Sequence, residues 1–142
     1  MTDNTERQIK RHIHSQPHQI IIKTAIGLEE ITEYKIREYL ESKDNPNKFN
    51  FEISDDKDGI LVKNIAFREI TELLARLTTY REVLWVIKEQ STRDVSSFQK
   101  VLAAINWQLI LAEGSEISFR CDSVGSRLFH ENMLKEICGK FF

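Results

Sequence analysis

The stretch Phe49-Asn-Phe-Glu-Ile-Ser-Asp-Asp-Lys-Asp-Gly-Ile-Leu-Val-Lys-Asn-Ile65 decides the fold. Apolar and polar residues alternate from Phe49 to Ile53, with the period of two that is typical of a half-buried strand. Residues 60–65 are again rich in β-branched apolar side chains. The acidic run between them ends in Asp58-Gly59, a pair that favours a tight turn. The sequence therefore predicts a β-hairpin.

Working outward from this hairpin, each side offers a helix and then a strand. Residues 20–24 and 83–87 are short apolar runs that predict two further strands. Residues 66–77 carry apolar side chains at helical spacing. Residues 28–41 do the same, with an expected buried face of Leu28, Ile31, Ile36, Tyr39 and Leu40. The order strand-helix-strand-strand-helix-strand predicts an α+β fold of the ferredoxin-like split βαβ kind, an antiparallel sheet with two helices on one face.

Residues 1–18 are mostly polar, and we expect a flexible N-terminal arm before a ferredoxin-like domain at residues 19–90. The arm holds His12, His14 and His18, which raises the question of a metal site. His12 and His14 lie two residues apart, a spacing that does not place them on one helix face, and no cysteine accompanies them. The sequence therefore predicts a tail and no metal site.

A second unit is expected at residues 91–142. A polar connector leads to Ser96 and Gln99, whose spacing is that of a helix capping box. A helix of residues 98–109 should follow, then a half-buried strand over Ile117–Cys121 and a closing helix from about residue 129. A single strand cannot make a sheet, so this unit looks incomplete.

The predicted strand, loop and helix over residues 117–130 would form an anion cradle. A small-residue loop around Gly125 and Ser126 precedes the helix, where free N–H groups and the positive end of the helix dipole favour a phosphate. Arg127 adds a planar guanidinium that can donate two hydrogen bonds to one phosphate. The alternative is that Gly125 only turns the chain and Arg127 is a solvated surface charge.

Composition limits the remaining classes. The chain has 142 residues, a net charge of -2 and no global basic signature for nucleic acid. Its two cysteines, Cys121 and Cys138, form no metal-binding motif and are expected to be reduced thiols. The sequence has no apolar run long enough for a membrane span. We expect an intracellular, cytoplasmic protein that has no membrane partner.

Other candidate sites favour structural roles. The aspartates of residues 55–58 lack the glycine and glutamate of a calcium loop, so a solvated hairpin is expected. Trp85 lies within an apolar strand and is expected in the core. For Trp107 two interpretations stay open, burial in the core or stacking on nucleic-acid bases. We find no nucleophile elbow, P-loop or dinucleotide fingerprint. No catalytic residue and no metal ligand is assigned.

Three segments resemble THUMP-containing RNA methyltransferases. Ile21-Ile-Lys-Thr-Ala-Ile-Gly-Leu-Glu-Glu30 looks like their opening T-x-x-G-L-E-E segment. Ala104-Ile-Asn-Trp107 and Gly125-Ser-Arg-Leu-Phe-His130, with Gly114 and residues 117–120 between them, resemble their THUMP domain. The resemblance covers roughly residues 19–142. It implies a ferredoxin-like domain, then a THUMP domain, then a Rossmann-like domain that methylates guanine N2 in ribosomal or transfer RNA with S-adenosylmethionine.

The resemblance assigns RNA-binding roles to Arg120, Ser126, Arg127 and Lys135, with the arginines on backbone phosphates. The chain lacks the glycine-rich cofactor loop and the Asn/Asp-Pro-Pro-Tyr/Phe motif, since its only prolines are Pro17 and Pro46. We therefore expect RNA binding without methyl transfer, no cofactor in this chain, and structured RNA and a methyltransferase domain or chain as partners. The alternative is a protein-interaction module with no RNA role. A small hydrolase is disfavoured, because residues 24–27 supply no anion-binding arginine.

Overall fold

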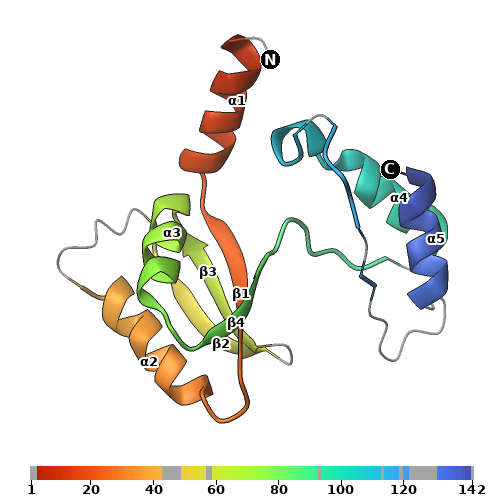
Figure 1. The fold of residues 1–142 in the computed structure, drawn as a ribbon. Coiled ribbons are helices and arrows are strands. Elements are labelled where there is room, and N and C mark those ends of the chain that lie inside the picture. The colour runs from red at the N-terminus through yellow and green to blue at the C-terminus, as the bar shows by residue number, and fades with distance from the viewer. Residues whose placement is uncertain are drawn as a thin grey trace. The chain divides into compact units, whose positions relative to one another are not determined.

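The computed structural model places the chain in two compact units, Met1–Ile87 and Lys88–Phe142, each of which is considered by itself (Figure 1). It describes residues 3–42, 49–56, 59–92, 94–112, 114–118, 120–121 and 131–141. The sequence interpretation set the division between units at residues 90 and 91, close to this one. Within the described ranges, no helix has both the length and the apolar character needed to cross a membrane.

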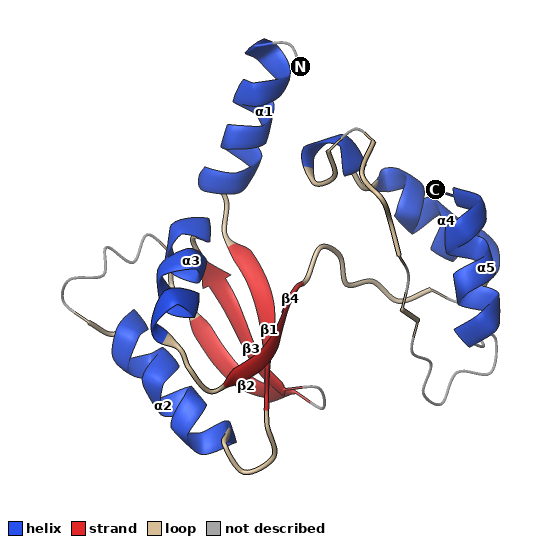
Figure 2. Cartoon of the chain, in the orientation of Figure 1, coloured by secondary structure: helices blue, strands red, loops and turns tan. Residues whose placement is uncertain are grey.

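The first unit is built on a four-stranded antiparallel sheet (Figure 2). Its strands lie in the order β2-β3-β1-β4, and every neighbouring pair is antiparallel. The predicted sequence of strands and helices is confirmed, as is the mixed α+β class. The elements along the chain are α1 (Asp3–His14), β1 (His18–Thr24), α2 (Glu29–Leu40), β2 (Glu52–Asp56), β3 (Gly59–Ile65), α3 (Phe67–Arg76) and β4 (Tyr80–Trp85).

Both α2 and α3 cover the same face of this sheet (Figure 2). In β1 the alternate residues Ile20 and Ile22 are buried, and in β3 Ile60 and Val62 are buried opposite them. These side chains form one cluster with buried residues of the two helices. Each fully buried isoleucine contributes about 2 kcal/mol through apolar burial. The full cluster is Ile20, Ile22, Ile36, Tyr39, Leu40, Ile60, Val62, Ile65, Ile70, Leu73 and Leu77.

The predicted buried face of α2 is partly wrong. Ile36, Tyr39 and Leu40 are buried as expected, but Leu28 and Ile31 are exposed. The buried face of α2 begins instead at Thr32, whose hydroxyl donates to the Leu28 carbonyl at 2.7 Å. The apolar residues of this helix are divided between two faces, and spacing alone does not reveal which face the sheet covers.

The predicted β-hairpin is confirmed, but its first strand begins three residues later than expected. It was predicted from Phe49, whereas β2 runs from Glu52 to Asp56 and pairs with β3 so that Asp56 lies opposite Gly59. Gly59 has φ +151°, and a Cβ built there would collide with the backbone carbonyl oxygen of Ile22 in β1. Glycine is therefore required by the close approach of two strands at this point.

The expectation of a flexible arm over residues 1–18 is wrong for most of its length. Residues 3–14 form α1, and His18 already belongs to β1. Ile9 and Ile13 of α1 lie one helical turn apart and are half-buried, whereas most of its other residues are exposed. The few apolar residues of this mostly polar segment are thus the contact face of an amphipathic helix.

The second unit contains α4 (Val95–Ala104), a 3-10 turn η1 (Trp107–Leu109) and α5 (Glu131–Phe141). Asp94, and not Ser96, caps α4, since its carboxylate accepts a 2.7 Å hydrogen bond from the Ser97 N–H. The helix ends earlier than the predicted residue 109. The indole N–H of Trp107 donates to the Leu102 carbonyl at 2.8 Å and occupies the acceptor that a further helical turn would use.

The predicted strand over residues 117–121 is wrong at its described positions. Ile117, Ser118, Arg120 and Cys121 have no regular secondary structure. The described residues of this unit contain no other strand with which they might pair. An unpaired segment has nowhere to place its backbone hydrogen bonds except water, so its alternating pattern is not enough to make a strand.

Candidate functional site

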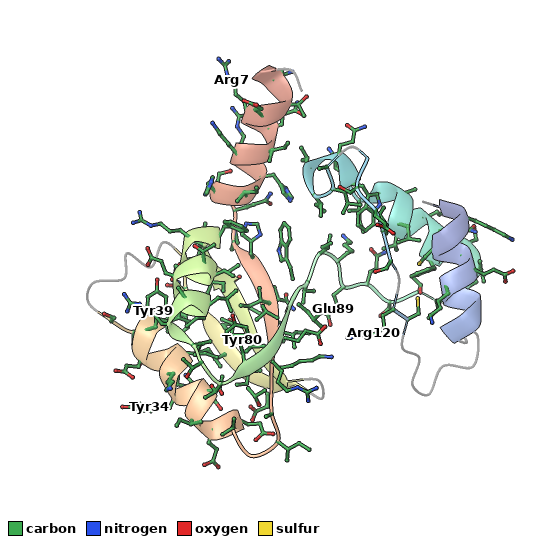
Figure 3. All side chains as sticks on the ribbon, in the orientation of Figure 1. Arg7, Tyr34, Tyr39, Tyr80, Glu89 and Arg120 are labelled. Carbon is green, nitrogen blue, oxygen red and sulfur yellow. The ribbon has the colours of Figure 1, made fainter. Side chains whose placement is uncertain are left out.

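The predicted anion cradle is described only in part. Ser126 and Arg127 lie outside the described residues, as does the rest of the loop at residues 122–130. Arg120 carries an exposed side chain on the segment before that loop (Figure 3). Lys135 is exposed on α5, the helix that follows the loop. Two of the four expected RNA-binding residues are therefore placed, one on either side of the loop.

Each of the two placed segments carries a cysteine. Cys121 and Cys138 are free thiols with partly buried side chains. Burial, and secondarily the neighbouring Cys121, raises the pKa of the Cys138 thiol. Cys121 directly follows Arg120, and Cys138 lies about one helical turn after Lys135. Arg120 and Lys135 are therefore exposed cations on the two segments that flank the loop, and Arg120 lies on irregular backbone where the sequence predicted a strand.

Both tryptophans of the chain are partly buried. Trp107 is half-buried and its indole N–H is bound to Leu102. Trp85 packs against the core of the first unit, as expected. Its ring centroid lies 5.3 Å from that of His18 in an edge-to-face contact. Both residues thus have partners within their own unit.

The histidines of the expected tail take part in an aromatic cluster instead. His12 and His14 of α1 and His18 of β1 contact Phe67 or Trp85, with centroid separations of 5.3 to 6.3 Å. His18 is only 7% exposed, and its Nε2 donates to the Ile13 carbonyl at 2.6 Å. Among the described residues, no three histidine, cysteine, aspartate or glutamate side chains are grouped to hold a metal ion. The cluster fastens α1 to the end of the sheet.

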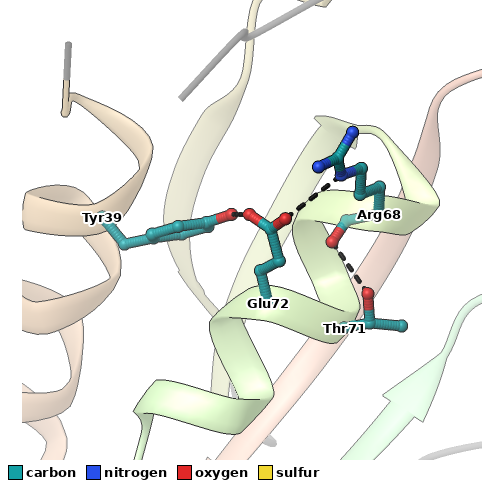
Figure 4. A network of polar contacts seen from close by, with 4 residues as sticks. All are labelled: Tyr39, Arg68, Thr71 and Glu72. Carbon is teal, nitrogen blue, oxygen red and sulfur yellow. Dashed lines mark hydrogen bonds and ion pairs between the residues drawn. The ribbon is translucent and has the colours of Figure 1, made fainter. Parts of the chain in front are cut away.

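A polar network that sequence reasoning missed joins α2 to α3 (Figure 4). The buried Tyr39 donates its hydroxyl to the Glu72 carboxylate, which also accepts from the Arg68 guanidinium at 3.1 Å. The Arg76 guanidinium carbon lies 4.7 Å from the centre of the Tyr39 ring. Burial, with the neighbouring Glu72, raises the pKa of Tyr39 to about 12. The hydrogen bond from Tyr39 and then that from Arg68 lower the pKa of Glu72.

Beside this network lies an open cleft of about 330 Å³. Its lining mixes the cations Lys35 and Arg76 with Glu38, the Tyr39 phenol and apolar carbon. It lies at the carboxyl-terminal turns of α2 and α3, where the helix dipoles present negative potential. Tyr39 already donates its only proton to Glu72. The network is therefore best understood as a structural link, and it offers no nucleophile or general base.

An apolar surface lies at the start of α2. Ile26 is 98% exposed in the turn before the helix, and Ile31 and Tyr34 are 47% and 67% exposed. Leu28, Ile31 and Tyr34 recur every three residues, so they share one side of the helix, and Tyr34 points away from the sheet (Figure 3). We call Ile26, Leu28, Ile31 and Tyr34 the α2 stripe. Contiguous exposed apolar side chains of this kind are typical of interaction surfaces.

No protein-family model, curated protein or solved structure matches this chain. The resemblance to THUMP-containing methyltransferases therefore remains a prediction from the quoted segments. The roles of Arg120 and Lys135 rest on their chemistry and placement alone.

Proposed function

We propose that this chain is the RNA-binding region of a THUMP-type RNA methyltransferase system. Its first unit is ferredoxin-like and its second is a partial THUMP-like unit. It presents structured ribosomal or transfer RNA to a domain that methylates guanine N2 with S-adenosylmethionine, on the same polypeptide or on a partner. This chain itself contributes binding and no chemistry, and its expected location is the cytoplasm.

The arrangement of the first unit supports this assignment of fold. In a split βαβ unit, the two strands joined by the first helix are not neighbours in the sheet, because another strand lies between them. Here β1 and β2 are separated by β3 in the order β2-β3-β1-β4. The two helices cover one face of the sheet, as the ferredoxin-like plan requires. The quoted resemblance expects such a domain before the THUMP region.

The observation that carries the RNA proposal is that Arg120 and Lys135 are both exposed, on the two segments that flank the loop at residues 122–130. Guanidinium and ammonium groups are the side chains that neutralise phosphates. Such contacts position an RNA without reading its sequence. Choice of the target guanine therefore belongs to the methyltransferase domain.

The charge balance of the chain limits the proposed RNA-binding surface to a local patch of cations. The whole chain has a net charge of -2, so no general attraction draws it to RNA. Affinity must come from a few phosphate contacts. It must fall as the salt concentration rises, because binding releases counterions from the RNA and this release is less favourable at high salt. We expect weak, salt-sensitive binding to folded RNA.

Fluorescence anisotropy with labelled transfer RNA and a ribosomal hairpin tests the proposal. The wild type is compared with an Arg120→Glu, Lys135→Glu double variant at low salt. The matched control reverses two exposed cations of α1, Arg7→Glu and Lys10→Glu. Each lost phosphate contact is expected to weaken binding several-fold, so the double variant should bind at least about tenfold more weakly.

Each outcome has a separate meaning. Loss of binding in the double variant but not in the α1 control supports the proposed interface. Loss in the α1 control alone moves the interface to the first unit. Absence of salt-sensitive binding by the wild type contradicts the RNA proposal altogether.

The α2 stripe favours a second candidate, a protein-interaction module. Ile26 is almost fully exposed on a short turn, where Gly27 donates its N–H to the Glu29 carboxylate at 2.9 Å. A turn held in this way presents Ile26 as a fixed apolar projection. Sedimentation velocity over a range of protein concentrations tests the simplest form of the idea, self-association. An Ile26→Glu variant should then sediment more slowly than the wild type, whereas a monomeric wild type at every concentration removes this support.

A further inference from the structure

The cleft between α2 and α3 has the size and the lining of a small-molecule site, and we call it the α2–α3 cleft. Its volume of about 330 Å³ falls at the lower end of the range found for ligand pockets. One wall is a face of α2 and the other is a face of α3, because the residues of each wall recur at intervals of three and four. They are Lys35, Glu38, Tyr39 and Ser42 from α2, and Leu73, Arg76 and Leu77 from α3.

The base of the α2–α3 cleft is apolar. It is formed by the buried side chains of Leu73, Leu77 and Tyr39. The Tyr39 hydroxyl already donates to the Glu72 carboxylate, so this residue offers a ligand mainly the carbon of its ring (Figure 4). A base of this kind favours a ligand with an apolar body, which would be removed from water on binding.

Three charged side chains surround this base. Lys35 and Arg76 bring positive charge to the cleft, and Glu38 brings negative charge. None of the three forms an ion pair with another described residue. The Arg76 guanidinium lies over the Tyr39 ring, 4.7 Å from its centre, which leaves its N–H groups for an acceptor. The charged groups of the cleft can therefore bind a ligand without first breaking an ion pair within the described residues.

The balance of charge decides the class of ligand. The carboxyl-terminal ends of α2 and α3 each add about half a negative charge. Together with Glu38 they offset the two cations, so the cleft is nearly neutral as a whole and does not favour a simple anion. It offers separated charges instead. The two cations suit a carboxylate, whereas Glu38 and the helix ends suit an ammonium group.

We propose that the α2–α3 cleft binds a free amino acid with an apolar side chain. Lys35 and Arg76 hold the carboxylate of this ligand, Glu38 holds its ammonium group, and its side chain covers the apolar base. An amino acid zwitterion is neutral as a whole, which matches the charge balance of the cleft. This ligand goes beyond RNA binding, and it involves residues of the first unit alone.

The test titrates the full-length chain with small molecules and follows its backbone amides by two-dimensional NMR. L-Phenylalanine carries both charges, 3-phenylpropanoate lacks only the ammonium group, and 2-phenylethylamine lacks only the carboxylate. L-Leucine is titrated as a second, smaller apolar amino acid. We expect saturable shifts at residues 35–42 and 73–77 with the amino acids. Each single-charge analogue should bind at least about fivefold more weakly than L-phenylalanine, because it leaves a charged group of the cleft without its partner.

Two variants separate the charged contacts. A Lys35→Met, Arg76→Met double variant should weaken L-phenylalanine and 3-phenylpropanoate by about tenfold and should not weaken 2-phenylethylamine. Glu38→Gln should weaken L-phenylalanine and 2-phenylethylamine and should not weaken 3-phenylpropanoate. The matched controls are Arg81→Met and Glu41→Gln, which change exposed residues outside the cleft and should leave all affinities unchanged. The amide spectrum of each variant also shows whether it is folded.

Three results would overturn the proposal. They are the absence of saturable shifts at these residues with both amino acids, equal affinity for L-phenylalanine and its two analogues, and unchanged L-phenylalanine binding in the cleft variants. The test involves no RNA, so its result is independent of the proposed function.

Discussion

The Tyr39 hydroxyl of α2 donates a hydrogen bond to the Glu72 carboxylate of α3, which links the two helices that cover the sheet. Tyr39 is buried, whereas the Glu72 side chain remains partly open to water. The same carboxylate accepts a hydrogen bond from Arg68, which lies one helical turn earlier in α3. The pair therefore couples the packing of two helices to the charge of one carboxylate.

Replacing Tyr39 with phenylalanine should destabilise the first unit with a defined pH dependence. The pKa of Glu72 is lowered in the folded chain, so its contribution is present above its unfolded pKa and is lost as the pH falls through the folded value. Urea unfolding should separate wild type and Tyr39→Phe most clearly near neutral pH and least in acid. Tyr34→Phe, an exposed position in the same helix, is the matched control. An equal loss at every pH would show that packing alone is affected.

The Tyr39 phenol should ionise later than the other tyrosines. Its pKa is about 12, chiefly because burial disfavours the phenolate. Because the pKa is raised in the folded chain, the stability contributed by the neutral phenol is fully present below the ordinary pKa of about 10. It is lost as the pH rises toward 12. Phenolate absorbance should show one of the three tyrosines titrating late. That late step should be missing from Tyr39→Phe, and a single common step in the wild type would contradict the network.

Gly59→Ala should be the most damaging single-methyl change in the first unit. The added Cβ would collide with the Ile22 carbonyl oxygen, and alanine would also have to adopt the positive φ of this position. We expect a loss of about 2 kcal/mol or more in urea unfolding. Gly27→Ala is a control for the strain alone, because Gly27 has φ +91° but open space around its Cβ position. It should cost only about 1 kcal/mol, and equal costs would rule out the predicted collision with Ile22.

Asp94→Ala should unravel the first turn of α4. Its carboxylate accepts from the Ser97 N–H, and this hydrogen bond holds the pKa of Asp94 below its usual value. Loss of such a cap costs about 1 kcal/mol. Hydrogen exchange should accelerate in residues 95–99. Ser96→Ala, which removes the residue that the sequence pattern favoured as the cap, should change little, and the opposite ranking would restore the capping-box prediction.

Local periodicity was sufficient to predict the four strands and two covering helices of the first unit. It was not sufficient to predict whether a strand has a partner or which face of a helix is buried. The four strands and two covering helices followed from apolar spacing, since each had a neighbour to pair with. The strand predicted at residues 117–121 failed because the described part of its unit has no partner strand. The exposed side of α2 was unpredictable for a related reason, because Leu28 and Ile36 are equally apolar and only the assembled sheet distinguishes them.

Long-range polar contacts were invisible in the sequence. Tyr39 and Glu72 belong to different helices, and no motif marks them as a pair. Of the predicted RNA-binding residues, Arg120 and Lys135 are exposed on the two segments that flank the loop, whereas Ser126 and Arg127 lie outside the described residues. The RNA-binding roles of all four stay predictions.

The most direct measurement is the salt dependence of RNA affinity for wild type and the Arg120→Glu, Lys135→Glu variant. The slope of log affinity against log salt counts the phosphates that a protein neutralises, at about 0.7 to 0.9 per contact. If both cations contact phosphates, the variant should have a slope smaller by about 1.4 to 1.8 than that of the wild type. Parallel lines for the two proteins would contradict the proposed interface.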